Sequence, residues 1–132
     1  MGFKEGDKVS ITVEITEKLV RDFAHVSGDM NLIHLDEEYA KKTRFGRRIA
    51  NGMLSGALIS QALAMKLGNG GIYLSQTLKF LSPIYIGDTV DINLTVSSLR
   101  DNGIAAVETI VVNQKGETCV KGVAMIMSPE AV

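Results

Sequence analysis

The sequence predicts an α+β protein in which an antiparallel β-sheet wraps around one long central α-helix. The first observation is the longest apolar stretch, Gly52 to Leu67, which is broken by Ser55, Ser60, Gln61 and Lys66 and is best explained as a buried helix. From residue 72 onward, apolar residues recur at every second position, as they do in strands with one buried face. Short turns rich in glycine and asparagine separate these stretches, which is typical of antiparallel neighbours.

The first third of the chain predicts one strand followed by helices. Apolar and polar residues alternate over 8–15, the period of two expected of a strand with one buried face. Helical spacing follows over 17–26, and Gly28 is placed to end that helix in the left-handed conformation. A loop is expected over 29–35, and then a short helix over 36–43 that its first residue, an aspartate, caps.

The remainder predicts the central helix and a meander of strands. The helix is expected over 51–67, with apolar side chains around most of its circumference and therefore with burial on nearly all sides. Arg100 to Gly103 contains an Asn-Gly pair, which favours a hairpin turn. Such a sheet has an open edge or face, so we expect a homodimer or a higher homo-oligomer of dimers. The strands are expected over residues 72–81, 90–96, 104–112 and 118–127.

Composition limits the classes of function. A length of 132 residues fits one domain, spanning 1–132. The net charge of −1 and the pI of about 6.1 argue against nucleic acid as a partner. The first seven residues are polar rather than signal-like, and the longest apolar run is shorter than the roughly 20 residues of a membrane span. Cys119 is the only cysteine, which favours a reducing, cytoplasmic setting without a disulfide or structural zinc.

Two stretches carry candidate chemistry. Asp29 and His34 form the only combination of an acid and an imidazole in a predicted loop, and such a pair can share one water and take its proton. The bland alternative is an aspartate that caps a turn beside a surface histidine. Gly52 opens the central helix, where a backbone N–H suits a developing negative oxygen, although glycine there also permits simple close packing.

The sequence resembles the MaoC-like (R)-specific enoyl-CoA hydratases of the hotdog fold, over nearly its whole length. Ser27 to Asp36 looks like the hydratase motif of an Asp, a spaced Asn and a His five residues after the Asp. Ile49 to Leu54 looks like the segment that enters the central helix. Ile72 to Gln76, with Phe80 and then Pro83 to Asp88, is common to many hotdog proteins and supports the fold more than the chemistry.

The resemblance implies reversible hydration of a trans-2-enoyl-CoA to a (3R)-hydroxyacyl-CoA, without a metal or redox cofactor, coenzyme A being part of the substrate. Asp29 and His34 match the catalytic pair of the family. Gly52 matches the glycine whose N–H receives the thioester oxygen. Asn31 matches the asparagine that shapes the loop, and Ser60 matches a serine often found near the site.

The chain departs from the family pattern at two positions. Leu32 stands where proline is usual, which loosens the loop slightly without touching a reacting group. Asn51 stands before the helix glycine, where the family commonly has histidine, and a different acyl-chain preference is expected if that histidine shapes the pocket. Asparagine is a good N-cap, and Asn51 is expected to cap the central helix.

Three alternatives stay open. A hotdog acyl-CoA thioesterase would need a carboxylate on the long helix, and Gly52 to Leu67 contains none. A non-catalytic acyl-CoA binding module would not need the Asp29 and His34 pair. An acyl carrier protein in place of coenzyme A remains possible. The basic segment from Arg44 to Arg48 either meets phosphate groups of the substrate or is simply solvated.

Overall fold

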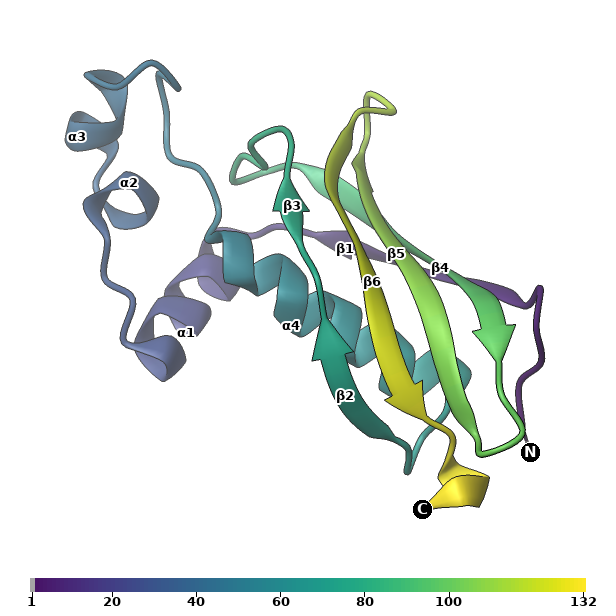
Figure 1. The fold of residues 1–132 in the computed structure, drawn as a ribbon. Helices are drawn as coiled ribbons and strands as arrows, with labels where there is room; N and C mark the ends of the chain where they lie inside the picture. Colours follow the sequence, from purple (N-terminus) through teal and green to yellow (C-terminus); the bar gives the residue numbers. More distant parts are fainter. Residues whose placement is uncertain (1) are drawn as a thin grey trace.

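A computed structural model describes residues 2–132, and Figure 1 shows a curved antiparallel sheet with one long helix lying against it. The helix ends in a π-helical turn, Leu63–Leu67. The helices are α1 (Glu17–Ser27), α2 (Leu32–Leu35), α3 (Glu37–Lys41) and α4 (Gly52–Ala62). The strands are β1 (Lys8–Glu14), β2 (Ile72–Gln76), β3 (Lys79–Phe80), β4 (Thr89–Leu99), β5 (Ile104–Asn113) and β6 (Thr118–Met127), and a short 3-10 helix (Pro129–Ala131) follows.

The sheet has the strand order β1-β4-β5-β6-β2, with β3 paired to β6, and every pairing is antiparallel. Alternate residues of β4, beginning with Val90 and Ile92, are fully buried, as the alternation of the sequence predicts. They pack in one core with Leu54, Leu58 and Ile59 of α4. The predicted α+β arrangement of a sheet around a central helix is therefore confirmed.

The central helix is less enclosed than expected. Met53 is 59% exposed and Met65 is 64% exposed, so the prediction of burial on nearly all sides is wrong. The physical reason is that a single sheet covers one side of the helix, and within residues 2–132 no second layer covers the other. An apolar helix face and the edge strand β2 are thus left open together.

Two predicted segments differ in detail. The strand expected over 72–81 is divided into β2 and β3, because Thr77 turns to bond Val123 through both its backbone N–H and its hydroxyl. The close approach explains Gly122, since a Cβ there would lie 1.7 Å from the Thr77 carbonyl oxygen. The loop expected over 29–35 contains the short helix α2.

Helices α1 to α3 gather beyond the N-terminal end of α4, away from most of the sheet (Figure 1). The Thr16 side chain caps α1, and Gly28 ends it with a φ of 76°, as predicted for Gly28. Arg48, on the connection from α3 to α4, makes a bidentate pair with Glu17 of α1 and a second pair with Glu37 of α3. This clamp holds the three helices over the start of α4.

Candidate active site

A cavity of about 520 Å³ lies between the start of α4, the connection that precedes it, and the chain from β3 to residue 84. Asp29, His34 and Gly52, which come from three separate stretches of the chain, line it together. Most of the remaining wall is apolar, which suits an acyl group more than a charged one. The apolar lining includes Ile49, Met53, Phe80, Leu81, Ile84 and Val120.

His34 is held in one tautomer. Its ring, 7% exposed, lies on α2 with Nδ1 2.8 Å from the carbonyl oxygen of Ile49. A carbonyl only accepts, so Nδ1 donates to it, and Nε2 of the neutral ring is left with a lone pair. The partner is a backbone atom, which explains why no feature of the sequence pointed to Ile49.

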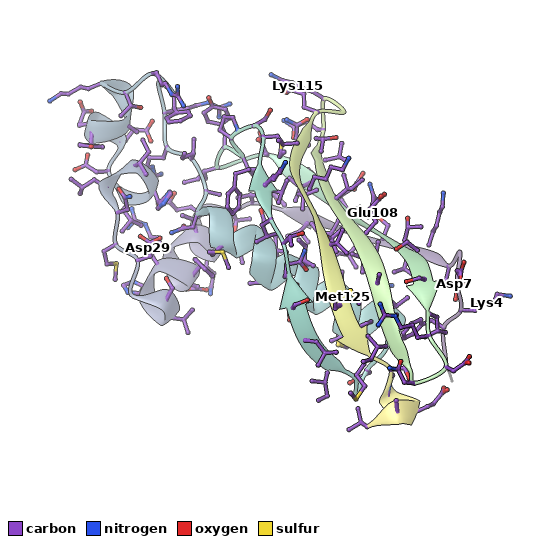
Figure 2. The ribbon with its side chains drawn as sticks, viewed as in Figure 1. Lys4, Asp7, Asp29, Glu108, Lys115 and Met125 are labelled. Atoms are coloured by element: carbon purple, nitrogen blue, oxygen red, sulfur yellow. The ribbon has the colours of Figure 1, made fainter. Side chains whose placement is uncertain are left out.

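Asp29 is held by two donors. It follows the left-handed Gly28 on the connection between α1 and α2, where Figure 2 labels it. Its Oδ1 accepts the backbone N–H of Asn31 at 3.2 Å, and its Oδ2 accepts the amide of Asn51 at 3.1 Å. The pKa of Asp29 lies below its ordinary value, and the hydrogen bond from Asn51 is the largest cause. The hydrogen bond from Asn31 and the nearby His34 lower it further. The carboxylate is therefore ionised at neutral pH.

Asn51 links the helix start to the motif loop. It is 2% exposed and makes no side-chain cap on α4, so the expectation that it caps the helix is wrong. Its amide nitrogen is committed to Asp29 instead. Its Oδ1 is buried and has no hydrogen-bond partner among residues 2–132. The amide thus serves the carboxylate at the cost of an unsatisfied acceptor.

Gly52 packs closely against the side chain of Phe80. A Cβ at this position would lie 2.9 Å from Cε1 of Phe80, so the close packing foreseen as an alternative role is real. Its N–H, in the first turn of α4, has no intrahelical acceptor and no other acceptor among residues 2–132. Ser55, one turn further, is 3% exposed and also lines the cavity. The sequence does not predict Ser55 as a site residue; its only signal is its position three residues from Gly52 on the same helix face.

The remaining predicted residues lie outside this wall. Asn31 caps α2, its Oδ1 accepting the N–H of Ile33 at 3.2 Å. Leu32 is the first residue of α2, a position that proline also suits, so this departure leaves the turn intact. Ser60 lines a separate cavity of about 90 Å³. The structure therefore brings Asp29, His34, Asn51 and Gly52 to one cavity but not Ser60.

Other reactive groups of the described chain lie elsewhere. Cys119 is fully buried, and burial raises the pKa of its thiol. His25 is exposed on α1. Residues 2–132 contain no group of three or more His, Cys, Asp or Glu side chains arranged to hold a metal ion. The same residues include no helix with the length and apolar character needed to cross a membrane.

Residues 3–118 match the family described as MaoC like domain. The chain belongs to this family. Two relatives of this MaoC-like chain are named (R)-specific enoyl-CoA hydratase. The one from Rhodospirillum rubrum is 39% identical over 127 residues, 96% of this chain and 88% of the relative. The one from Aeromonas caviae is 38% identical over 126 residues, 94% of either chain.

Solved structures agree with the predicted hotdog fold. The R-hydratase PhaJ1 from Pseudomonas aeruginosa, in its unliganded form, superimposes with a TM-score of 0.92 at 45% identity, covering 96% of this chain and 83% of that one. The (R)-hydratase from A. caviae involved in PHA biosynthesis superimposes with a TM-score of 0.93 at 37% identity, covering 96% of this chain and 98% of that one. The hotdog fold and the MaoC-like resemblance are both confirmed.

Proposed function

We propose that this MaoC-like protein is an (R)-specific enoyl-CoA hydratase, a lyase that adds water reversibly to a trans-2-enoyl-CoA and gives a (3R)-hydroxyacyl-CoA. The observation that carries the proposal is the ionised Asp29 and the Nε2 of His34 on the wall of one apolar cavity, beside the free N–H of Gly52. Relatives and structural neighbours with hydratase names support the same reaction.

The two side chains suit a single water molecule. The carboxylate of Asp29 and Nε2 of His34 are both acceptors, so a water between them can donate to both and direct its lone pair at C3 of the enoyl group. The water oxygen bonds to C3, and the proton that the water loses passes through the pair to C2. The pair ends the cycle in its starting state, and the dehydration runs the same steps in reverse.

The thioester oxygen needs a donor while negative charge develops on it. The N–H of Gly52 at the positive end of α4 is placed for this role, and a donor of this kind contributes about 3–4 kcal/mol elsewhere. Asn51 and Asn31 hold Asp29, and Ser60 remains a prediction for the substrate surroundings.

The test is loss of the conjugated thioester absorbance of crotonyl-CoA by the wild type, Asp29→Asn and His34→Ala. General acid–base groups contribute roughly 10²- to 10⁴-fold, so each variant is expected to lose at least about a hundredfold in kcat. His25→Ala, which removes the other, exposed histidine, is the matched control and should retain activity. An (R)-specific dehydrogenase checks the product stereochemistry.

Other outcomes would favour the competing functions. Release of free thiol from the thioester would indicate a thioesterase, although α4 and its π-helical turn carry no carboxylate. Binding of acyl-CoA without turnover at any chain length would indicate a binding module.

We expect the working form to be a homodimer, in the cytoplasm. The exposed apolar surface includes the free edge of β2 and the exposed side of α4 with Met53. It also includes the exposed side chains of Phe80 and Leu81, which line the cavity. A second copy would cover this apolar surface and close the cavity.

A further inference from the structure

The connection from α3 to α4 carries three arginines, which differ in whether they form ion pairs. Arg48 is bound by Glu17 and Glu37. Among residues 2–132, Arg44 and Arg47 have no carboxylate within ion-pair distance. Two permanent positive charges are therefore free to meet an anion.

Arg44 belongs to the catalytic cavity. It lines the same wall as Asp29 and His34, and it is the only arginine or lysine among the lining residues. It comes from the connection between α3 and α4, whereas Gly52 opens α4. One cavity therefore offers both a cation and the groups proposed to act on the thioester.

Arg47 belongs to a second hollow that adjoins the first. This hollow, of about 260 Å³, shares Ser82 and Pro83 with the catalytic cavity and is also lined by Lys115. A long substrate that leaves the catalytic cavity over Ser82 and Pro83 therefore enters a space with two further cations.

Tyr85 contacts the Arg47 side chain and the backbone beside Arg44. Its hydroxyl donates to the carbonyl of Phe45, the residue after Arg44, at 3.3 Å. The guanidinium carbon of Arg47 lies 3.9 Å from the centroid of the Tyr85 ring. The hollow also holds two carboxylates, which are hydrogen-bonded within its own wall: Asp88 accepts from the Tyr85 backbone N–H and from Gln114, and Glu117 accepts from the Asn113 amide. Among residues 2–132, neither lies within ion-pair distance of Arg47 or Lys115.

We propose that Arg44 and Arg47 bind the phosphate groups of coenzyme A while its acyl thioester lies beside His34; this assignment rests on the proposed function. A planar guanidinium matches a phosphate with two parallel hydrogen bonds, and stacking on Tyr85 lowers the entropy that Arg47 loses on binding. Under this assignment both groups meet the phosphates and not the reacting carbons, so we expect them to act on affinity and not on the chemical step.

The test compares thioesters with and without phosphate. Dissociation constants of butyryl-CoA and butyryl-pantetheine, which cannot be hydrated, are measured by calorimetry for the wild type, Arg44→Gln and Arg47→Gln. Each variant is expected to bind butyryl-CoA about tenfold more weakly than the wild type. The dissociation constant of butyryl-pantetheine is expected to stay unchanged. Arg100→Gln, in the turn between β4 and β5, removes a cation outside both hollows and should change neither.

Unchanged affinity for butyryl-CoA, or equal losses for both ligands, would overturn the assignment. The second result would mean that the arginines support the cavity rather than the phosphates. A wild type that binds butyryl-CoA but does not hydrate crotonyl-CoA would reject the hydratase proposal and leave the phosphate result standing by itself.

Discussion

At the scale of single residues, Asn51 favours the ionised form of Asp29, the carboxylate to which the proposed function assigns catalysis. Its amide makes the strongest contribution to the lowered pKa of Asp29, and it has no titratable proton of its own. The ionised form of Asp29 is favoured by this bond, so the active state should persist below the ordinary pKa of an aspartate.

Asn51→Ala is expected to raise the pKa of Asp29, because the largest cause of its lowering is removed. The acidic limb of the kcat/KM profile for crotonyl-CoA should move to higher pH, with a smaller effect on the plateau. Asn69→Ala, an exposed asparagine at the far end of the central helix, is the control and should leave the limb in place. A limb that does not move in Asn51→Ala would mean that Asn51 only supports the packing.

Residues close in sequence could be assigned before the structure was seen. Asp29 and His34 are five positions apart, and a local motif was enough to pair them. Asn51 reaches Asp29 across 22 positions, and its position before a helix favoured a cap that the structure does not contain. Nothing in a single sequence distinguishes an asparagine that caps a helix from one that serves a distant carboxylate.

At the scale of elements, Arg48 joins α1 and α3 above the start of α4. Its side chain is only 15% exposed, and the bond to Arg48 is the main reason why the pKa of Glu17 lies below its ordinary value. That stabilisation is complete above the ordinary pKa of a glutamate and is lost as the pH falls through the lowered value.

Arg48→Gln is expected to lower the free energy of unfolding by about 1–2 kcal/mol at neutral pH, a value that allows for the partial exposure of both glutamates. The deficit should shrink in acid as Glu17 takes up a proton. Urea denaturation at several pH values measures both effects. Lys18→Gln removes an exposed ion pair with Asp22 and should cost almost nothing, so equal losses in the two variants would argue against the clamp.

Elements with strong periodicity matched the sequence most closely. The alternation in β4 and the turn before Ile104 correspond to the observed hairpin. The break between β2 and β3 depends on the contact of Thr77 with β6, which has no local signal.

At the scale of the whole molecule, the open side of the sheet sets the expected assembly. Ile72 on the edge strand β2 is 46% exposed, and Val123 on the face of β6 that turns away from α4 is 42% exposed.

Ile72→Lys is expected to weaken the dimer by at least about tenfold in its dissociation constant, since it places a charge at the edge. Val123→Lys is the matched control. Sedimentation velocity over a dilution series measures the result, and equal behaviour of the two variants would contradict an interface along β2.

The burial pattern of the whole molecule was only partly predictable. An apolar helix face predicts burial, but a single sequence does not separate the surface that the chain's own sheet covers from the surface that a second copy would cover. The exposed Met53 and Met65 show where that distinction was missed.

The bond from His34 to the Ile49 carbonyl has a consequence for selectivity. A ring that could rotate, or exchange its proton between two nitrogens, would approach a flat double bond from more than one direction. The bond to the carbonyl fixes the ring while Nδ1 is engaged, so under the proposed function Nε2 is the ring nitrogen that faces the water. A fixed Nε2 and a fixed Asp29 then approach a bound thioester from one side, so this backbone hydrogen bond contributes to handedness together with the shape of the acyl pocket.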